Sequence, residues 1–105
     1  MVKNLAQLKR HMQVGTRYEM VENVLKPKTN GEIRTINKVQ TNAISALRDG
    51  GDYWTPWQKA KNMRFNSDNT VDFLFGETVN DLWARREQES QGKDYWLKIK
   101  LLDVA

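Results

Sequence analysis

Apolar side chains near the N-terminus recur at the spacing of a helix. Leu5, Leu8 and Met12 are three and four positions apart, and most of the residues between them are polar. Because this spacing places the three side chains on one face, we predict an amphipathic helix within residues 1–14. Gly15 follows and can adopt the left-handed conformation that commonly ends a helix.

Residues 16–65 have the pattern of short strands separated by turns. We predict strands over residues 16–25, 32–40, 41–47, 53–57 and 63–65, with one helical turn over 58–62. Asn30-Gly31 and the segment 48–52 supply the turn chemistry between them. In the second of these strands Ile33, Ile36 and Val39 step by three positions instead of two, which predicts a bulge or a sharp coil.

Residues 67–105 predict a strand, a helix and a second strand. Val71, Phe73 and Phe75 alternate with other residues, as in a strand with one buried face. Thr78 is a suitable N-cap for a helix that Gly92 would end. A terminal strand is predicted from the alternating residues Tyr95, Leu97, Ile99 and Leu101. We expect this terminal strand to pair with residues 71–75.

The whole chain is expected to form one α+β domain, since 105 residues are too few to bury two separate cores. The order of elements between Gly15 and Asn66 resembles that of the SH3-like small barrels of bacterial proteins. This resemblance implies an antiparallel barrel over residues 15–66, preceded by the helix of 1–14 and followed by a strand-helix-strand extension over 67–105. The nearest alternative is an OB-like barrel.

Three short stretches carry a second resemblance. LKRHMQVGTRYEMV, KVQTN and W-x-x-W-x-KA are similar to segments of small uncharacterised proteins encoded by prophages and plasmids of Gram-positive bacteria. The resemblance implies an accessory protein of a phage or plasmid. It implies no activity and no site residues, because none is assigned to those proteins.

Several kinds of chemistry are excluded by composition. The chain has no cysteine, which rules out disulfides, thiolate nucleophiles and cysteine-ligated metals. His11 is the only histidine, so a metal site with two His ligands is impossible, and no serine lies in a G-x-S-x-G motif. We therefore expect a protein that is not an enzyme and that uses no metal or cofactor. No apolar run approaches the roughly 20 residues of a membrane span, and no signal peptide is evident, so we expect a cytoplasmic protein without a membrane partner.

Paired carboxylates are the remaining candidates for acid–base chemistry. Asp68 with Asp72, and Asp49 with Asp52, are close enough in sequence to act together or to bind a hard cation. All four lie in or beside predicted turns, where aspartate is common because it bonds to nearby backbone. We favour the role in turns.

The charge distribution points to a polyanion as partner. The net charge is +4, but residues 1–64 carry 12 Lys and Arg against 5 Asp and Glu, whereas residues 65–105 carry 5 against 8. The basic part is the predicted barrel, so we predict that its outer face binds nucleic acid. The residues expected to contact the phosphates are Arg17, Lys26, Lys28, Arg34, Lys38, Arg48 and Lys61.

Trp54 is the candidate for stacking on a base. Tyr53, Thr55 and Trp57 face one side of their strand and Trp54 faces the other, so one core cannot bury them all. Two alternatives remain open: the tryptophans could all be covered by the helix and the C-terminal extension, and the lysines could serve only to prevent strand edges from pairing. The alternative function is a protein-binding inhibitor or adaptor that acts on a host defence protein through the same surface or an exposed strand edge.

Overall fold

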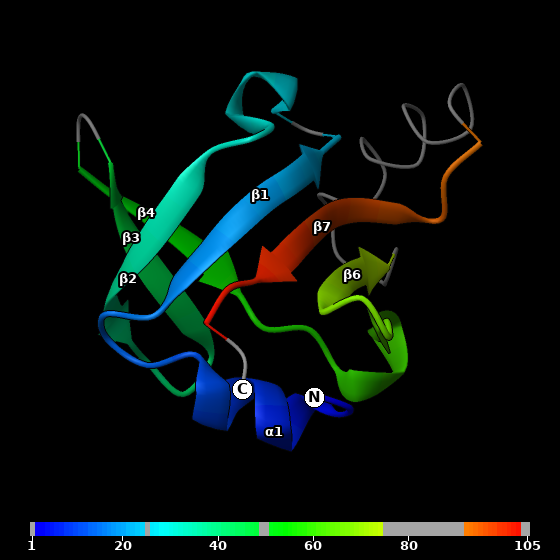
Figure 1. Ribbon diagram of the computed structural model, residues 1–105, viewed down its shortest axis with the longest axis horizontal. Helices are drawn as coiled ribbons and strands as arrows, with labels where there is room; N and C mark the ends of the chain where they lie inside the picture. The colour runs from blue at the N-terminus through cyan, green and yellow to red at the C-terminus, as the bar shows by residue number, and fades with distance from the viewer. Residues whose placement is uncertain (1, 25, 49–50, 75–91, 104–105) are drawn as a thin grey trace.

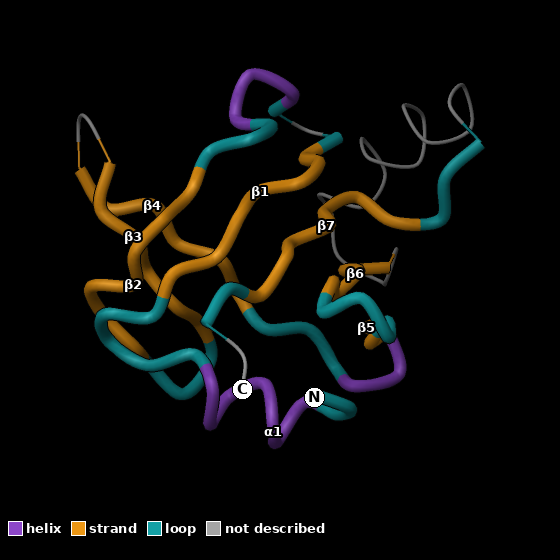
Figure 2. Tube along the Cα trace, in the orientation of Figure 1, coloured by secondary structure: helices purple, strands orange, loops and turns teal. Residues whose placement is uncertain are grey.

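The computed structural model describes residues 2–24, 26–48, 51–74 and 92–103. Within these residues the chain forms one antiparallel sheet of seven strands, one α-helix and two short 3-10 turns (Figures 1 and 2). The elements are α1 (Leu5–His11), β1 (Arg17–Asn23), η1 (Pro27–Thr29), β2 (Ile33–Val39), β3 (Ala43–Arg48), β4 (Gly51–Pro56), η2 (Ala60–Asn62), β5 (Met63–Phe65), β6 (Thr70–Leu74) and β7 (Tyr95–Leu101).

Helix α1 is shorter than its apolar spacing predicts. It begins after Asn4, whose side chain accepts a hydrogen bond from the backbone N–H of Gln7 at 2.8 Å and so satisfies one of the free donors of the first turn. Leu8 and Met12 are both fully buried, and the helix closes one end of the space that the sheet curls around (Figure 1). Gly15 has a φ of +94°, which confirms the predicted left-handed residue after the helix.

The strands are ordered β4-β3-β2-β1-β7-β6-β5. Strand β2 is the corner of this sheet: its first residues, from Ile33 to Thr35, pair with β1, whereas its later residues pair with β3. The register shifts between Ile36 and Lys38, so Asn37 is the extra residue of a bulge. The predicted irregularity in this strand is therefore confirmed, and the sheet bends there.

The predicted SH3-like barrel over residues 15–66 is wrong. Closure would require the last strand of that segment, β5, to pair near the first strand, β1. Instead β7 lies between β1 and β6 and pairs with both, so β5 pairs only with β6 at the far edge. The C-terminal strand thus occupies the edge of β1 that closure needed, and the sheet stays open.

Strand β7 confirms one prediction and extends it. The expected pairing with the strand of residues 71–75 is present, with Val71 opposite Ile99. On its other side β7 pairs with β1, where Met20 is opposite Ile99. Strand β7 is therefore a central strand of the sheet, with a partner on each side. The helix predicted between Thr78 and Gly92 lies outside the described residues.

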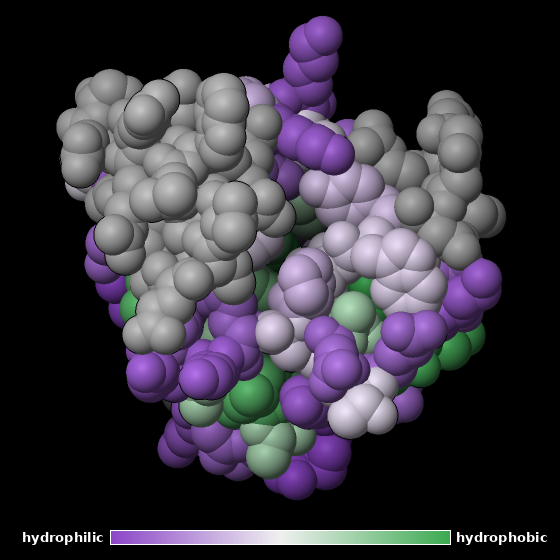
Figure 3. Space-filling model, turned by 180° about the vertical axis from the view of Figure 1, so that it is seen from behind, coloured by the Kyte–Doolittle hydropathy of each residue, from purple (hydrophilic) through white to green (hydrophobic). Residues whose placement is uncertain are grey.

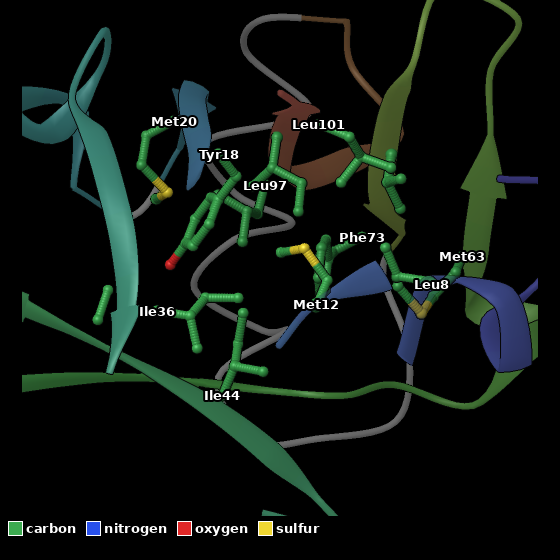
Figure 4. Packing of buried hydrophobic residues seen from close by; sticks show 13 residues of the cluster. Leu8, Met12, Tyr18, Met20, Ile36, Ile44, Met63, Phe73, Leu97 and Leu101 are labelled. Atoms are coloured by element: carbon green, nitrogen blue, oxygen red, sulfur yellow. The ribbon is translucent and has the colours of Figure 1, made fainter. Parts of the chain in front are cut away.

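One hydrophobic core fills the concave side of the sheet. Its members come from α1 and from six of the strands, and their side chains point toward a common interior (Figure 4). They are Leu8, Met12, Tyr18, Met20, Ile36, Ile44, Ala46, Met63, Val71, Phe73, Leu97, Ile99 and Leu101. The alternation of Leu97, Ile99 and Leu101 in β7 accounts for its central place, because each alternate residue is buried.

Candidate functional site

The residues predicted to contact nucleic acid are spread over the molecule. Lys26 and Lys28 are exposed on the turn η1, at one end of β1, and Arg17 lies at the other end (Figure 1). Lys61 is exposed on η2, and Arg48 ends β3 with a side chain outside the described part of the structure. Arg17 forms an ion pair with Asp103 at 3.1 Å. The expected gathering of all these charges on one barrel face is therefore not present.

Lys38 and Trp54 do share a face. In the paired strands Lys38 of β2 is opposite Ser45 of β3, and Ser45 is opposite Trp54 of β4. Side chains at directly opposed positions lie on the same side of a sheet, so these three form one row across β2, β3 and β4. The neighbouring residues Ile44, Ala46 and Thr55 are buried on the concave side, which places the row on the outer face. Trp54 is 40% exposed there, which decides a question that the sequence left open.

Ser45, the small residue in the middle of this row, is buried although it lies on the outer face of the sheet. Ser45 is fully buried, and its hydroxyl has no hydrogen-bond partner in the described structure. Its opposed neighbours on that face are Lys38 and Trp54, which flank it in the row.

The other described tryptophans belong to the core side. Trp57 stacks on Phe73 with ring centroids 6.5 Å apart, and Trp96 meets the edge of the same ring at 5.7 Å. The indole N–H of Trp96 donates to Gln58 Oε1 at 2.7 Å. The alternative that tryptophans are covered is therefore correct for these two and not for Trp54, while Trp83 lies outside the described residues.

Arg34 does not lie on the outer surface. It is only 2% exposed, because it alternates with buried Ile36 and stands opposite Tyr18 of β1 on the concave side. Its guanidinium carbon lies 3.9 Å from the centroid of the Tyr53 ring, and the Lys26 ammonium lies 5.1 Å from the same centroid. Its expected role as a contact for a phosphate on the outer surface is therefore not supported, since the side chain lies on the concave side and is covered.

A polar cluster surrounds Arg34 inside the curled sheet. The hydroxyls of Tyr18 and Thr55 are buried without a hydrogen bond of normal geometry, and the Tyr18 hydroxyl has both Thr55 and the Arg34 guanidinium as neighbours. Burial raises the pKa of Tyr18, while the nearby Arg34 and Thr55 oppose this rise. In the close view the Tyr18 hydroxyl points toward β2 (Figure 4). The sequence did offer one indication of this burial: Arg34 is two positions from Ile36 and therefore lies on the same, apolar face of the strand.

An ionic network lies on the outer side of β5, β6 and β7. Asp72 is 1% exposed and accepts a hydrogen bond from Arg64 Nε at 2.7 Å, with Lys98 Nζ 3.5 Å from its other oxygen. Arg64 also donates to both oxygens of Asp94, at 2.6 and 2.9 Å. These bonds lower the pKa of Asp94 and raise the pKa of Arg64. Both carboxylates are thereby held as structural ion pairs.

The predicted carboxylate pairs separate into different roles. Asp68 accepts from the backbone N–H and the hydroxyl of Thr70 and is exposed, which confirms it as a turn residue. These bonds lower its pKa. Asp72 is instead a strand residue held by cations, so its assignment to a turn was wrong. Asp49 and the side chain of Asp52 lie outside the described structure.

A second ionic group links β1 to β7. Glu22 accepts hydrogen bonds from the Lys93 ammonium and from the Tyr95 hydroxyl, the latter at 2.5 Å. Partial burial acts to raise the pKa of Glu22, but these two partners outweigh it and lower the pKa. Burial, followed by Glu22, raises the pKa of Tyr95. The group fastens the start of β7 to the end of β1.

The described residues contain no group of three or more side chains suited to hold a metal ion. Among the described helices none has the length and apolar character needed to cross a membrane.

The face seen from behind carries hydrophilic residues around its lower rim, and residues of intermediate hydropathy gather beside a hollow near its centre (Figure 3).

Comparisons with protein-family models, with curated proteins and with solved structures found no match to this chain in any of the three. The resemblance to prophage and plasmid proteins therefore stays a prediction.

Proposed function

We propose that this protein is a non-enzymatic module that binds single-stranded nucleic acid on the outer face of β2, β3 and β4. The observation that carries the proposal is the row of Lys38, Ser45 and Trp54, in which a partly exposed indole and an exposed lysine lie on the same face of the sheet. A base can stack on the indole because every base has an aromatic face, and lysine can neutralise a phosphate.

The set of contact residues is smaller than the set taken from the sequence. Lys38 and Trp54 form the centre, and the exposed Lys26 and Lys28 of η1 add positive charge at one end of the sheet. Arg34 is excluded because it is buried, and Arg17 is a weaker candidate because Asp103 compensates its charge. Phosphate contacts by the remaining lysines would position the strand without reading its sequence.

The test is a titration of a fluorescein-labelled oligothymidylate with the purified protein, followed by fluorescence anisotropy at several salt concentrations. Trp54→Ala is expected to weaken binding by about 5- to 150-fold, which corresponds to roughly 1–3 kcal/mol for one stacked base. Lys38→Ala is expected to reduce the slope of log affinity against log salt by about one. Lys100→Ala serves as the control, because Lys100 is exposed on β7, away from this row.

Absence of oligonucleotide binding at low salt would reject the proposal. Equal losses of affinity for the oligonucleotide in Trp54→Ala and Lys100→Ala would reject the outer face of β2, β3 and β4 as the binding surface. Binding would then depend on positive charge elsewhere on the protein.

Binding to a protein is the second candidate. It is favoured by the position of β4, which is the last strand on its side of the sheet in the described structure. An edge strand can accept a further strand from a partner through backbone hydrogen bonds. Pro56 would shorten the available edge, since proline lacks a donor. Capture of a host protein by the wild type, lost when Thr55 is replaced by proline, would favour this function.

A further inference from the structure

The polar cluster inside the sheet has more hydrogen-bond donors than acceptors. An arginine side chain carries five N–H donors and no acceptor. The one acceptor that Arg34 has among the described residues is Glu32 Oε1, 3.4 Å from Nη2. Its Nε and Nη1 atoms are buried and have no acceptor in the described structure. The two nearby hydroxyls, of Tyr18 and Thr55, can each accept, but each also brings a further donor.

Among the described residues, the cluster also has less negative than positive charge. Burying a charged group is costly unless it is paired and fully hydrogen-bonded. The positive groups at the Tyr53 ring are Arg34 and Lys26, and the carboxylate that pairs with Arg34 is that of Glu32, which is itself partly exposed. The ring attracts both cations, but it offers no oxygen to their N–H groups. Negative charge and acceptor oxygens would together complete this arrangement.

The cluster lies close to the surface on one side. Lys26 on η1 is exposed, whereas Arg34 is buried, and both contact the same ring of Tyr53. Asn23 Nδ2 donates to the Tyr53 hydroxyl at 3.3 Å, which ties the end of β1 to β4 at this point. The Tyr53 ring therefore has one exposed and one buried cation beside it, between η1 and β4.

We infer that this cluster is a binding site for a small oxyanion of the phosphate type. Its oxygens would accept from the unpartnered guanidinium nitrogens and from the Tyr18 and Thr55 hydroxyls, and its charge would balance Arg34 and Lys26. A neutral ligand would satisfy the donors but leave the charge unbalanced. The inference does not rest on the centre of the proposed nucleic-acid surface, because the cluster is on the concave side and the row of Lys38 and Trp54 is on the outer face. Lys26 is the one residue that the two proposals share.

The experiment is a titration of the whole protein with inorganic phosphate, with sodium chloride used to keep the ionic strength constant. The first readout is the NMR signal of the Arg34 Nε–H group, assigned by its loss in Arg34→Met, and the second is the melting temperature. The site predicts a saturable shift of that signal. It also predicts a rise in melting temperature of about 5 °C at a phosphate concentration tenfold above Kd.

Variants distinguish phosphate binding at this cluster from a general effect of phosphate on protein stability. Arg34→Met keeps much of the side-chain volume without the donors and should abolish the thermal effect. Lys26→Ala removes an exposed charge and should weaken phosphate binding by about fivefold, as one surface Coulomb interaction would. Tyr18→Phe should weaken binding because it removes one donor, whereas Lys100→Ala on β7 should bind phosphate like the wild type.

The inference fails if phosphate causes no saturable shift of the Arg34 signal in the wild type. It fails equally if Lys26→Ala and Tyr18→Phe both bind phosphate as tightly as Lys100→Ala, a comparison that holds even if Arg34→Met does not fold. Loss of oligonucleotide binding in Trp54→Ala, with phosphate binding retained, would support the separation of the two sites.

Discussion

Two buried charged residues, Arg34 and Asp72, are compensated in different ways. Asp72 is almost inaccessible, but Arg64 and Lys98 lie beside its two oxygens and Asn66 donates to it at 3.0 Å. Arg34 is equally buried, yet most of its N–H groups lack an acceptor in the described structure. The first arrangement is that of a structural ion pair, whereas the second is the one at which we propose that an oxyanion binds.

The carboxylate of Asp94 provides a prediction about acid stability. Hydrogen bonds from Arg64 lower the pKa of Asp94 in the folded state, so the folded protein binds its proton less tightly than the unfolded chain does. The resulting stabilisation is present above the unfolded pKa of about 4 and is lost as the pH falls through the lower folded pKa. We expect Asp94→Asn to be less stable than the wild type at pH 7 and to lose less stability between pH 5 and pH 2.

Urea denaturation at a series of pH values measures this difference. Asp68, Asp103 and Glu22 also have lowered pKa values, so the variant should retain part of the acid dependence. Lys100→Ala should keep the wild-type pH profile. An unchanged profile for Asp94→Asn would show that Arg64 does not stabilise the Asp94 carboxylate in solution.

At the scale of elements, β7 and β2 determine the shape of the sheet. Strand β7 pairs along both edges, with β1 and β6, and buries alternate residues in the core. Strand β2 changes partner at its bulge and turns β3 and β4 back toward β1. The contact of Asn23 on β1 with Tyr53 on β4 follows from that turn, because these strands are not neighbours in the sheet.

The central place of β7 predicts a large difference between neighbouring positions. Ile99 lies between Met20 and Val71 and is fully buried, so Ile99→Ala should lower the free energy of unfolding by about 2–5 kcal/mol. Lys100→Ala, one position along and exposed, should change it by less than about 0.5 kcal/mol. Urea unfolding followed by circular dichroism gives both values. Similar values for the two variants would contradict the register of β7.

At the scale of the molecule, the sheet curls around one core without closing. Residues from β1, β2 and β4 meet across the interior as polar groups, while six of the strands, β1 and β2 among them, supply apolar ones together with α1. The core therefore depends on both ends of the chain. Leu8 and Met12 come from the N-terminal helix, and Leu97 to Leu101 come from the last strand.

This organisation predicts that the segment first assigned to a barrel cannot fold alone. A chain that ends at residue 66 lacks β6 and β7, which leaves one edge of β1 unpaired and removes Val71, Phe73, Leu97, Ile99 and Leu101 from the core. We expect this fragment to show the circular dichroism spectrum of an unfolded chain and no cooperative thermal transition. Cooperative unfolding of the fragment would show that a smaller barrel forms without the C-terminal strand.

Local features of the molecule were accessible from the sequence because they depend on neighbours along the chain. The N-terminal helix, the strand alternation, the bulge near Ile36 and the outward orientation of Trp54 follow from side-chain periodicity and turn chemistry. Pairing with residues 71–75 was also predicted for the last strand, since both have one apolar face.

Only the tertiary structure decided which strands became neighbours and which charges were buried. Whether the edge of β1 pairs with β5 or with β7 depends on competing long-range contacts, and the open sheet results from the pairing of β7 with both β1 and β6. The same bend at β2 that brings β4 over β1 places Arg34 against Tyr53 inside the fold. Periodicity determines the face of a strand on which a side chain lies, but what that face meets depends on residues distant in the sequence.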